Sequence, residues 1–232
     1  MRRAFAEYAT SASAFGMKSV LVKKPESVTF EQAASAPVAA LTALQALRDK
    51  GRIQAGQKVL INGAAGGVGT FAVQMAKLFD AHVTGVCSTG NVNMVRSIGA
   101  DRVIDYTEND FTQSGERYDI ILDCVGNRSL SACRRVLSSK GILVLIGAPD
   151  RATDILARVI GALVWSRFGA KKIVFFIARV NKDDLTTMGE FMAAGKMTPV
   201  IDKHYRLSEA SNAFRYMEQG HARGKVIITL EC

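Results

Sequence analysis

The chain has 232 residues, 48% of them hydrophobic, which is enough for one large domain, or one and a half smaller ones, around a sizeable core. A membrane span needs about 18 consecutive uncharged apolar residues. The best apolar stretch, 155–165, is shorter and contains Arg158, so no membrane span is expected. The net charge of +9 comes from scattered basic residues, which favours a solvated surface over a nucleic-acid-binding face.

Two helices are predicted near the amino terminus. Thr29 with Gln32 three residues later is a capping-box pattern, so a helix should begin there. Pro37 should end it, because proline removes a backbone donor and clashes with the preceding turn. A second helix is predicted at 38–50, with Gly51 as its stop.

From Lys58 onward, short apolar runs alternate with helical patterns. The predicted strands are 58–62, 82–88, 102–106, 118–126, 141–148 and 172–178, and the helices between them are 68–79, 92–100 and 129–137. Such alternation is typical of parallel strands joined by right-handed crossovers, so the predicted fold class is α/β with a doubly wound parallel sheet. Helices at 183–196 and 207–220 and a strand at 224–230 follow.

The stretch NGAAGGVGTFAVQMAK, 62–77, places a glycine-rich turn between a strand and a helix. Ala64-x-Gly66-x-x-Gly69 differs from the dinucleotide-binding fingerprint only at its first position, and Gly63 still permits the tight turn. A helix N-terminus offers free N–H donors to a pyrophosphate. A nucleoside-triphosphate loop is excluded because no lysine follows Gly69. The alternative is that the glycines only let strand and helix pack closely.

The end of the second predicted strand bears on the choice of nicotinamide cofactor. An NAD site usually places a carboxylate there to accept the ribose hydroxyls. Residues 82–96 contain no Asp or Glu, and the polar side chains near the strand end are Ser88, Thr89, Asn91, Asn93 and Arg96. Hydroxyls and amides accept a 2′-phosphate that a carboxylate would repel, so the sequence favours NADPH over NADH. Alternatively, these residues only cap a helix.

The cysteines and histidines predict neither a metal site nor a disulfide framework. The cysteines and histidines are Cys87, Cys124, Cys133, Cys232, His82, His204 and His221. Their spacing contains no Cys-x-x-Cys or His-x-x-x-His pattern. We interpret Cys87 and Cys124 as small buried hydrophobic residues near strand ends. The first residues lack the features of a secretory signal or a transit peptide, so a cytoplasmic location is expected.

Five stretches together resemble the medium-chain dehydrogenase/reductase superfamily: 62–77, 86–107, 118–127, 141–149 and 220–230. They are most similar to its zinc-free quinone oxidoreductase branch and to the reticulon-interacting mitochondrial NADPH oxidoreductases. The resemblance implies three parts: a remnant of a GroES-like β-barrel domain at 1–35, a Rossmann NADP-binding domain at 36–198, and a C-terminal return to the first domain at 199–232. If the chain is natural rather than a fragment of a longer protein, low activity, poor solubility or a homodimer formed through exposed edges is expected.

The resemblance also implies which residues bind the cofactor. Ala65, Gly66, Gly67 and Val68 would lie along the pyrophosphate, while Ser88, Thr89 beside it and Tyr106 would approach the 2′-phosphate. Ile146, Phe175 and Phe176 would line the nicotinamide, and a C-terminal loop would return to the cofactor with His221, Ala222, Arg223 and Lys225. For His221, a loop residue without a contact is an equal alternative. Gly90 and Asn91 stand where the family often has a basic residue.

The implied chemistry is hydride transfer from NADPH to a quinone or an activated enone, without zinc. No general acid is identified, because no tyrosine has a lysine four residues later. The apolar segment 155–168 either caps a substrate pocket or packs at a domain or subunit edge. Three hypotheses remain: an NADP-dependent quinone oxidoreductase, a truncated and non-catalytic NADPH-binding module, and a nucleic-acid-binding protein supported only by the basic charge.

Overall fold

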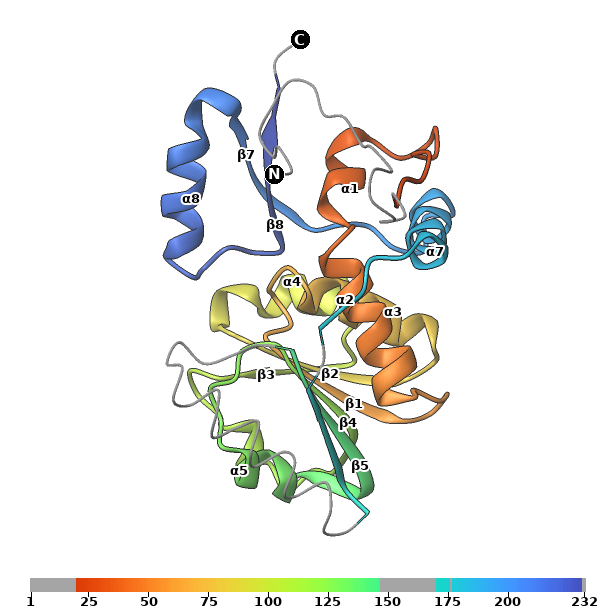
Figure 1. The fold of residues 1–232 in the computed structure, drawn as a ribbon. Coiled ribbons are helices and arrows are strands. Elements are labelled where there is room, and N and C mark those ends of the chain that lie inside the picture. Colours follow the sequence, from red (N-terminus) through yellow and green to blue (C-terminus); the bar gives the residue numbers. More distant parts are fainter. Residues whose placement is uncertain (1–19, 147–169, 176, 231–232) are drawn as a thin grey trace.

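The computed structural model describes residues 20–146, 170–175 and 177–230, and its central element is a six-stranded parallel sheet (Figure 1). The strands are β1 (Lys58–Asn62), β2 (His82–Cys87), β3 (Arg102–Asp105), β4 (Tyr118–Asp123), β5 (Leu137–Leu145) and β6 (Lys172–Phe175). Their spatial order is β3-β2-β1-β4-β5-β6, and every neighbouring pair is parallel. The predicted doubly wound α/β sheet is therefore confirmed.

Helices cover both faces of this sheet. Helices α2 (Ala39–Gln45), α3 (Gly69–Leu78) and α4 (Val92–Ser97) lie on one face, and α5 (Leu130–Arg135) lies on the other (Figure 1). Strand β1 faces both layers: Val59 and Ile61 belong to one hydrophobic cluster and Leu60 to the other. Burial on both faces explains why this strand is a continuous apolar run rather than an alternating one.

The first helices follow their sequence signals closely, with one difference. Helix α1 (Phe30–Ser35) has the predicted capping box between Thr29 and Gln32. Helix α2 follows Pro37, but the chain then continues as a π-helical turn, η2 (Ala46–Gly51). The left-handed residue that ends this turn is Arg52, with φ 52°, rather than Gly51. Gly51 provides clearance instead, because a Cβ there would lie 3.1 Å from the Ala46 carbonyl oxygen.

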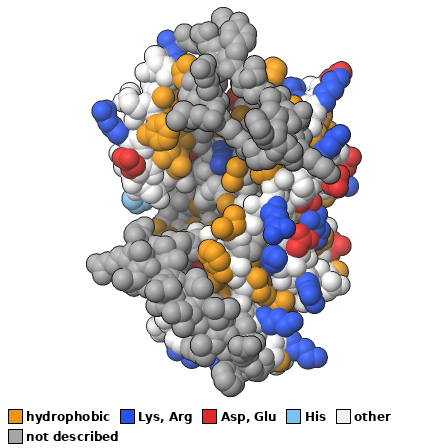
Figure 2. Space-filling model, viewed as in Figure 1, with side chains coloured by type: hydrophobic (Ala, Val, Ile, Leu, Met, Phe, Trp, Pro, Cys, Tyr) orange, Lys and Arg blue, Asp and Glu red, His pale blue; other side chains and the backbone are white. Residues whose placement is uncertain are grey.

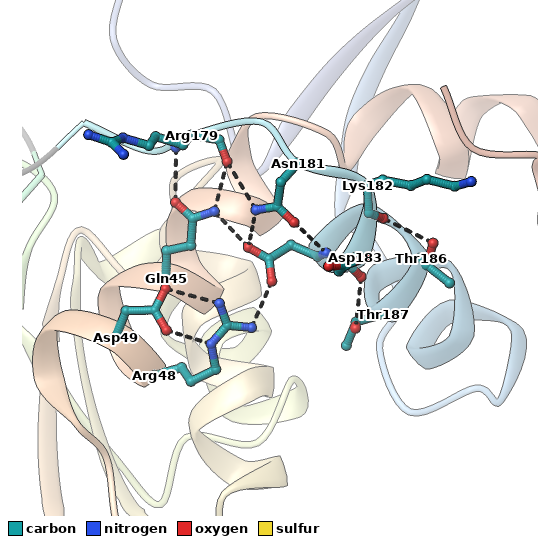
Figure 3. A network of polar contacts seen from close by, with 10 residues as sticks. Gln45, Arg48, Asp49, Arg179, Asn181, Lys182, Asp183, Thr186 and Thr187 are labelled. Atoms are coloured by element: carbon teal, nitrogen blue, oxygen red, sulfur yellow. Dashed lines mark hydrogen bonds and ion pairs between the residues drawn. The ribbon is translucent and has the colours of Figure 1, made fainter. Parts of the chain in front are cut away.

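A polar network fastens α2 and η2 to the start of α7 (Lys182–Ala193) (Figure 3). The carboxylate of Asp184 accepts hydrogen bonds from Gln45, Arg48 and Asn181, each at 2.7 Å. Gln45 also binds the backbone of Arg179 twice: its Nε2 donates to the carbonyl at 2.8 Å, and its Oε1 accepts from the N–H at 3.0 Å. These contacts hold the segment that follows β6 against the helical layer.

A second, two-stranded sheet lies above the first in Figure 1. Strands β7 (Ile201–Arg206) and β8 (Lys225–Thr229) are parallel and are connected through a short 3₁₀ turn, η5 (Leu207–Glu209), and α8 (Ala210–Glu218). Strand β8 and the two helices α7 and α8 match the predictions. Strand β7 was not predicted, because its sequence IDKHYR has too few apolar residues to signal a strand without its partner.

The boundary between α5 and β5 differs from the prediction. The helix ends at Arg135, and β5 begins at Leu137, four residues before the predicted start. Leu137 pairs with Tyr118 across a register shift in the ladder, and both side chains are buried. An isolated leucine fits either a helical or a strand period, so the pairing with β4 decides the outcome.

Three expectations concern parts of the chain outside the described residues: the N-terminal segment 1–19, the apolar segment 155–168, and Phe176. Within the described ranges, none of the helices has the length and apolar character needed to cross a bilayer. The division of the chain at residues 36 and 199 stays a prediction.

Candidate functional site

The glycine turn between β1 and α3 is fastened to the neighbouring strand. The N–H groups of Gly63 and Ala64 both donate to the carbonyl oxygen of Val86, at 3.1 and 2.9 Å. Gly63 has φ +86°, a left-handed conformation that favours glycine. A Cβ at Gly69 would come within 2.0 Å of the Gly63 carbonyl oxygen, so close packing of turn and helix requires glycine there.

The same turn also presents hydrogen-bond donors. Val68 is the N-cap of α3, and no side chain caps this helix. Within the described part of the chain, the N–H groups of Gly67 and Val68 have no protein acceptor. Unpaired N–H groups at the positive end of a helix dipole form an anion-binding site. Close packing thus depends on Gly63 and Gly69, whereas the N–H groups without an acceptor belong to Gly67 and Val68.

A loop from the second sheet closes over the turn. The N–H of Gly224 donates to the carbonyl of Ala65 at 2.8 Å, and the N–H of Lys225 donates to that of Val200 at 2.9 Å. The Lys225 side chain lies over Gly67: a Cβ at residue 67 would be 3.2 Å from its Cδ and 3.5 Å from its Nζ. Lys225 therefore stands at the mouth of the turn.

The ammonium group of Lys225 is electrostatically unsatisfied. It is half-buried, and burial lowers the pKa of Lys225 below its ordinary value. No carboxylate among the described residues pairs with it. An anion in the cleft would stabilise the charged form of this lysine.

A second polar group lies at the end of β2. The side-chain amide of Asn91 donates to Ser88 Oγ at 3.0 Å, while Asn91 Oδ1 is buried without a hydrogen-bond partner. The guanidinium of Arg223 reaches this point from the C-terminal loop: a Cβ at Gly90 would lie 3.5 Å from its Nη2. Within the described residues, this guanidinium has no acidic partner. The guanidinium of Arg223, from the C-terminal loop, thus lies beside Gly90.

These features line one cleft of about 770 Å³ between the two sheets. Figure 2 shows a hollow where the upper and lower parts of the molecule meet, and Lys and Arg side chains distributed over the face shown. Most of the predicted cofactor residues line the cleft: Ala65, Gly66, Gly67, Val68, Ser88, Tyr106, Ile146, His221, Ala222, Arg223 and Lys225. No Asp or Glu among the described residues lines it.

Two predicted cofactor residues, Thr89 and Phe175, lie outside the cleft lining. Thr89 forms a 3.0 Å hydrogen bond with Thr107 and lines a neighbouring polar cavity, because the short 3₁₀ turn η3 (Thr89–Asn91) directs it towards the end of β3. Phe175, at the end of β6, is 45% exposed and lies outside the cleft lining. Phe176 is outside the described residues. Their cofactor contacts stay predictions.

The structure adds residues at the ends of β1 and β4 that the sequence reasoning missed. Asn62 donates to Asp123 Oδ1 at 2.9 Å and to Asn127 Oδ1 at 3.0 Å. Asn62 and Asn127 line the cleft together with Cys124 and Val125. The order of the sheet reverses between β1 and β4, and ligands of such sheets bind at that reversal. The polar residues that directly follow the fourth predicted strand could have indicated this part of the cleft.

The cysteines of the cleft are not poised for chemistry. Burial raises the pKa of Cys87 to about 11, with a smaller contribution from Asp105. Burial also raises the pKa of Cys124 to about 12, assisted by the neighbouring Asp123. Cys87 is buried as predicted, whereas Cys124 is half-buried and faces the cleft. No group of three or more potential metal ligands occurs among the residues described.

The known proteins that this chain resembles are dehydrogenases and oxidoreductases. The sequence model of a family described as zinc-binding dehydrogenase matches residues 98–228. The chain is 38% identical over 229 residues to the mitochondrial NAD(P)H oxidoreductase RTN4IP1 of Bos taurus, covering 89% of this chain and 57% of that protein. It is 34% identical over 224 residues to the chloroplast envelope quinone oxidoreductase homolog of Arabidopsis thaliana, covering 93% and 67%.

A solved structure extends the comparison to three dimensions. The quinone oxidoreductase from Coxiella burnetii superposes with a TM-score of 0.80 at 31% identity, over 90% of this chain and 64% of that one. The chain thus spans little more than half of the bovine relative and about two thirds of the other two proteins.

Proposed function

This chain belongs to the medium-chain dehydrogenase/reductase superfamily, and on that premise we propose that it is an NADPH-dependent oxidoreductase that reduces a quinone or an activated enone without zinc. This proposal depends most on the ammonium of Lys225, which has no carboxylate partner among the described residues and lies over the turn where the N–H groups of Gly67 and Val68 have no acceptor in the described chain. This is the arrangement that a pyrophosphate would complete.

The residues present fit the pyrophosphate of a dinucleotide. The N–H groups of Gly67 and Val68 would donate to its oxygens, and Lys225 would neutralise its charge. Glycine at 67 keeps this side of the turn clear, because a Cβ there would lie 3.2 Å from both the Gly224 carbonyl oxygen and the Lys225 Cδ. Binding would remove the cost of holding a half-buried ammonium without a counter-ion.

The residues at the end of β2 support the choice of NADPH. Arg223, Ser88, Asn91 and Tyr106 surround this end of the cleft, and acidic side chains are missing from its described lining. A 2′-phosphate would find there hydroxyl or amide donors and a guanidinium that has no acidic partner in the described part of the chain. The nearest strand-end carboxylate, Asp105, is engaged with the N–H and hydroxyl of Thr107. A ribose without the phosphate would leave Arg223 without an anion.

The nicotinamide end of the cofactor would lie near Ile146, Asn62 and Asn127, at the carboxyl ends of β5, β1 and β4. Bound NADPH supplies a hydride from C4 of its nicotinamide to an electron-poor carbon of the substrate. The chain's own residues orient that ring and exclude water from one side of it. The accompanying proton comes from solvent in this proposal, and no residue is assigned as general acid.

A second candidate is a non-catalytic NADPH-binding module. It is favoured by the finding that the chain spans 57% of the bovine relative and that no residue of the described cleft is assigned to a substrate. The two candidates share the cofactor cleft and differ only in whether a substrate reaches the nicotinamide.

Turnover measurements separate the two candidates. We would follow NADPH absorbance with purified chain and a panel of benzoquinones, naphthoquinones and conjugated enones, with Lys225→Met as the matched negative control. Oxidation of NADPH that requires both substrate and Lys225 would support the oxidoreductase. Binding of NADPH without turnover would support the module, and absence of binding would overturn both.

A cytoplasmic location and a homodimer formed through exposed edges belong to the same proposal, as does the absence of nucleic-acid binding. Analytical ultracentrifugation tests the homodimer, and a fluorescent fusion tests the location. RNA affinity that falls steeply with salt would contradict the expectation on nucleic acid.

A further inference from the structure

The loop at 220–225 carries three cationic or ionisable side chains into the cleft: His221, Arg223 and Lys225. Two glycines with left-handed backbone flank its sharp bends, Gly220 at φ +72° and Gly224 at φ +73°. A Cβ at Gly224 would come within 2.2 Å of the Val200 carbonyl oxygen. The path of this loop is therefore narrowly defined at its C-terminal end.

The two halves of the loop are held by different contacts. The C-terminal half is pinned by backbone bonds alone, from Gly224 to Ala65 and from Lys225 to Val200. The N–H of Arg223 instead donates to a side chain, Asp202 Oδ2, at 3.0 Å. The hydroxyl of Tyr216 donates to the same oxygen at 2.5 Å. One carboxylate oxygen thus ties β7, α8 and the loop together.

This carboxylate binds the backbone of Arg223 and leaves its guanidinium unpaired within the described residues. An acidic residue that paired with the guanidinium would compete with a phosphate, whereas one that binds the backbone N–H only aims the side chain. The guanidinium of Arg223 points towards Gly90, since a Cβ built on Gly90 would lie 3.5 Å from Arg223 Nη2.

We propose that Asp202, held by Tyr216, is a positioning residue that sets the preference of this chain for a 2′-phosphorylated nucleotide by fixing the backbone of Arg223. The inference rests on the proposed function, since it needs a nicotinamide nucleotide in the cleft. Asp202 is not among the residues that line the cleft. Its loss leaves the anchors of Gly224 and Lys225 in place, so the pyrophosphate contacts persist while the guanidinium loses its fixed position.

Calorimetric dissociation constants for NADPH and NADH provide the test. We expect Asp202→Ala to reduce the preference for NADPH over NADH by about tenfold while leaving the NADH dissociation constant within about twofold of wild type. Asp202→Asn keeps an acceptor oxygen and should retain most of the preference. Amide hydrogen exchange of the unliganded protein should show faster exchange at 220–223 in Asp202→Ala.

Tyr216→Phe keeps the test open if Asp202→Ala does not fold, and it should reduce the preference by about threefold. Tyr205→Phe is its matched control: the two tyrosine rings lie 6.4 Å apart, and no hydrogen bond of the Tyr205 hydroxyl is found among the described residues. Equal weakening of both nucleotides, or an unchanged preference in Asp202→Ala and Tyr216→Phe, would overturn the inference. A wild-type protein that binds neither nucleotide would overturn the proposed function and the inference with it.

Discussion

The side chain of Lys225 lies so close over Gly67 that a Cβ atom at residue 67 would be 3.2 Å from the lysine Cδ. The two residues are far apart in sequence. Gly67 lies in the turn that follows β1 of the six-stranded sheet, and Lys225 begins β8 of the two-stranded sheet. Their contact places a half-buried ammonium beside the N–H donors of the turn.

Lys225→Met should weaken NADPH binding without destabilising the fold. Burial disfavours the charged ammonium, so an apolar side chain of similar length removes an unfavourable term from the unliganded protein. One charge-assisted hydrogen bond contributes about 1.5–3 kcal/mol, which is roughly a ten- to hundredfold loss of affinity. Calorimetry and thermal melting measure both effects.

The exposed Lys196 gives the control for that variant, because Lys196→Met removes the same charge away from the cleft. Its NADPH affinity should equal that of wild type. Equal affinity of Lys225→Met and wild type would remove Lys225 from the cofactor site.

Arg223→Gln should weaken NADPH binding and spare NADH. The guanidinium lies at the end of β2 without an acidic partner among the described residues, so its contribution depends on the 2′-phosphate. We expect about a tenfold rise of the NADPH dissociation constant. Arg215→Gln, on the exposed face of α8, should change neither constant. A parallel loss for both nucleotides would assign Arg223 to another part of the cofactor.

Gly69→Ala should destabilise the fold itself. Its Cβ would come within 2.0 Å of the Gly63 carbonyl oxygen and 2.8 Å of the Ala64 Cα, and backbone atoms cannot move aside as a flexible side chain can. Overpacking of this kind costs about 1–3 kcal/mol or more. Urea denaturation should show a lower midpoint, and a wild-type midpoint would show that the turn relaxes.

Asp184 should make stability fall in acid. Burial acts to raise the pKa of Asp184, but hydrogen bonds from Arg48, Asn181 and Gln45 outweigh it and hold the pKa below its ordinary value. A carboxylate with a lowered folded-state pKa contributes stability above its unfolded pKa of about 4, and that stability is lost as pH falls through the folded pKa.

Urea denaturation between about pH 7 and pH 2.5 tests this expectation. At neutral pH the free energy of unfolding of Asp184→Asn should be about 2 kcal/mol lower than that of wild type. Below pH 4 the variant should lose less stability than wild type. The adjacent and exposed Asp183 provides the control variant Asp183→Asn, which should follow the wild-type pH dependence. Parallel curves for wild type and Asp184→Asn would contradict the role of Asp184.

Local patterns predicted much of the fold. The alternating strands and helices depend on side-chain periodicity, which each segment carries by itself, and Gly63 and Gly69 marked the turn because their neighbours leave no room for a Cβ. Strand β7 was missed because pairing with β8 forms it, and Leu137 was assigned to a helix because one buried leucine suits both periods.

The contacts between distant parts of the chain were harder to predict. Gln45 and Asp184 are 139 residues apart, and Asn62 and Asp123 are 61 apart, so no local pattern connects them. The resemblance to known dehydrogenases supplied Lys225 and Arg223, but their positions over Gly67 and beside Gly90 depend on the fold of the C-terminal loop. The rotation of Thr89 towards Thr107 depends equally on a short turn.

Isothermal titration of the purified chain with NADPH and with NADH tests the central claim most directly. The account predicts that NADPH binds one site per chain, at least about tenfold more tightly than NADH, because the 2′-phosphate adds a charge-assisted contact. No heat of binding with either nucleotide, or tighter binding of NADH, would contradict it.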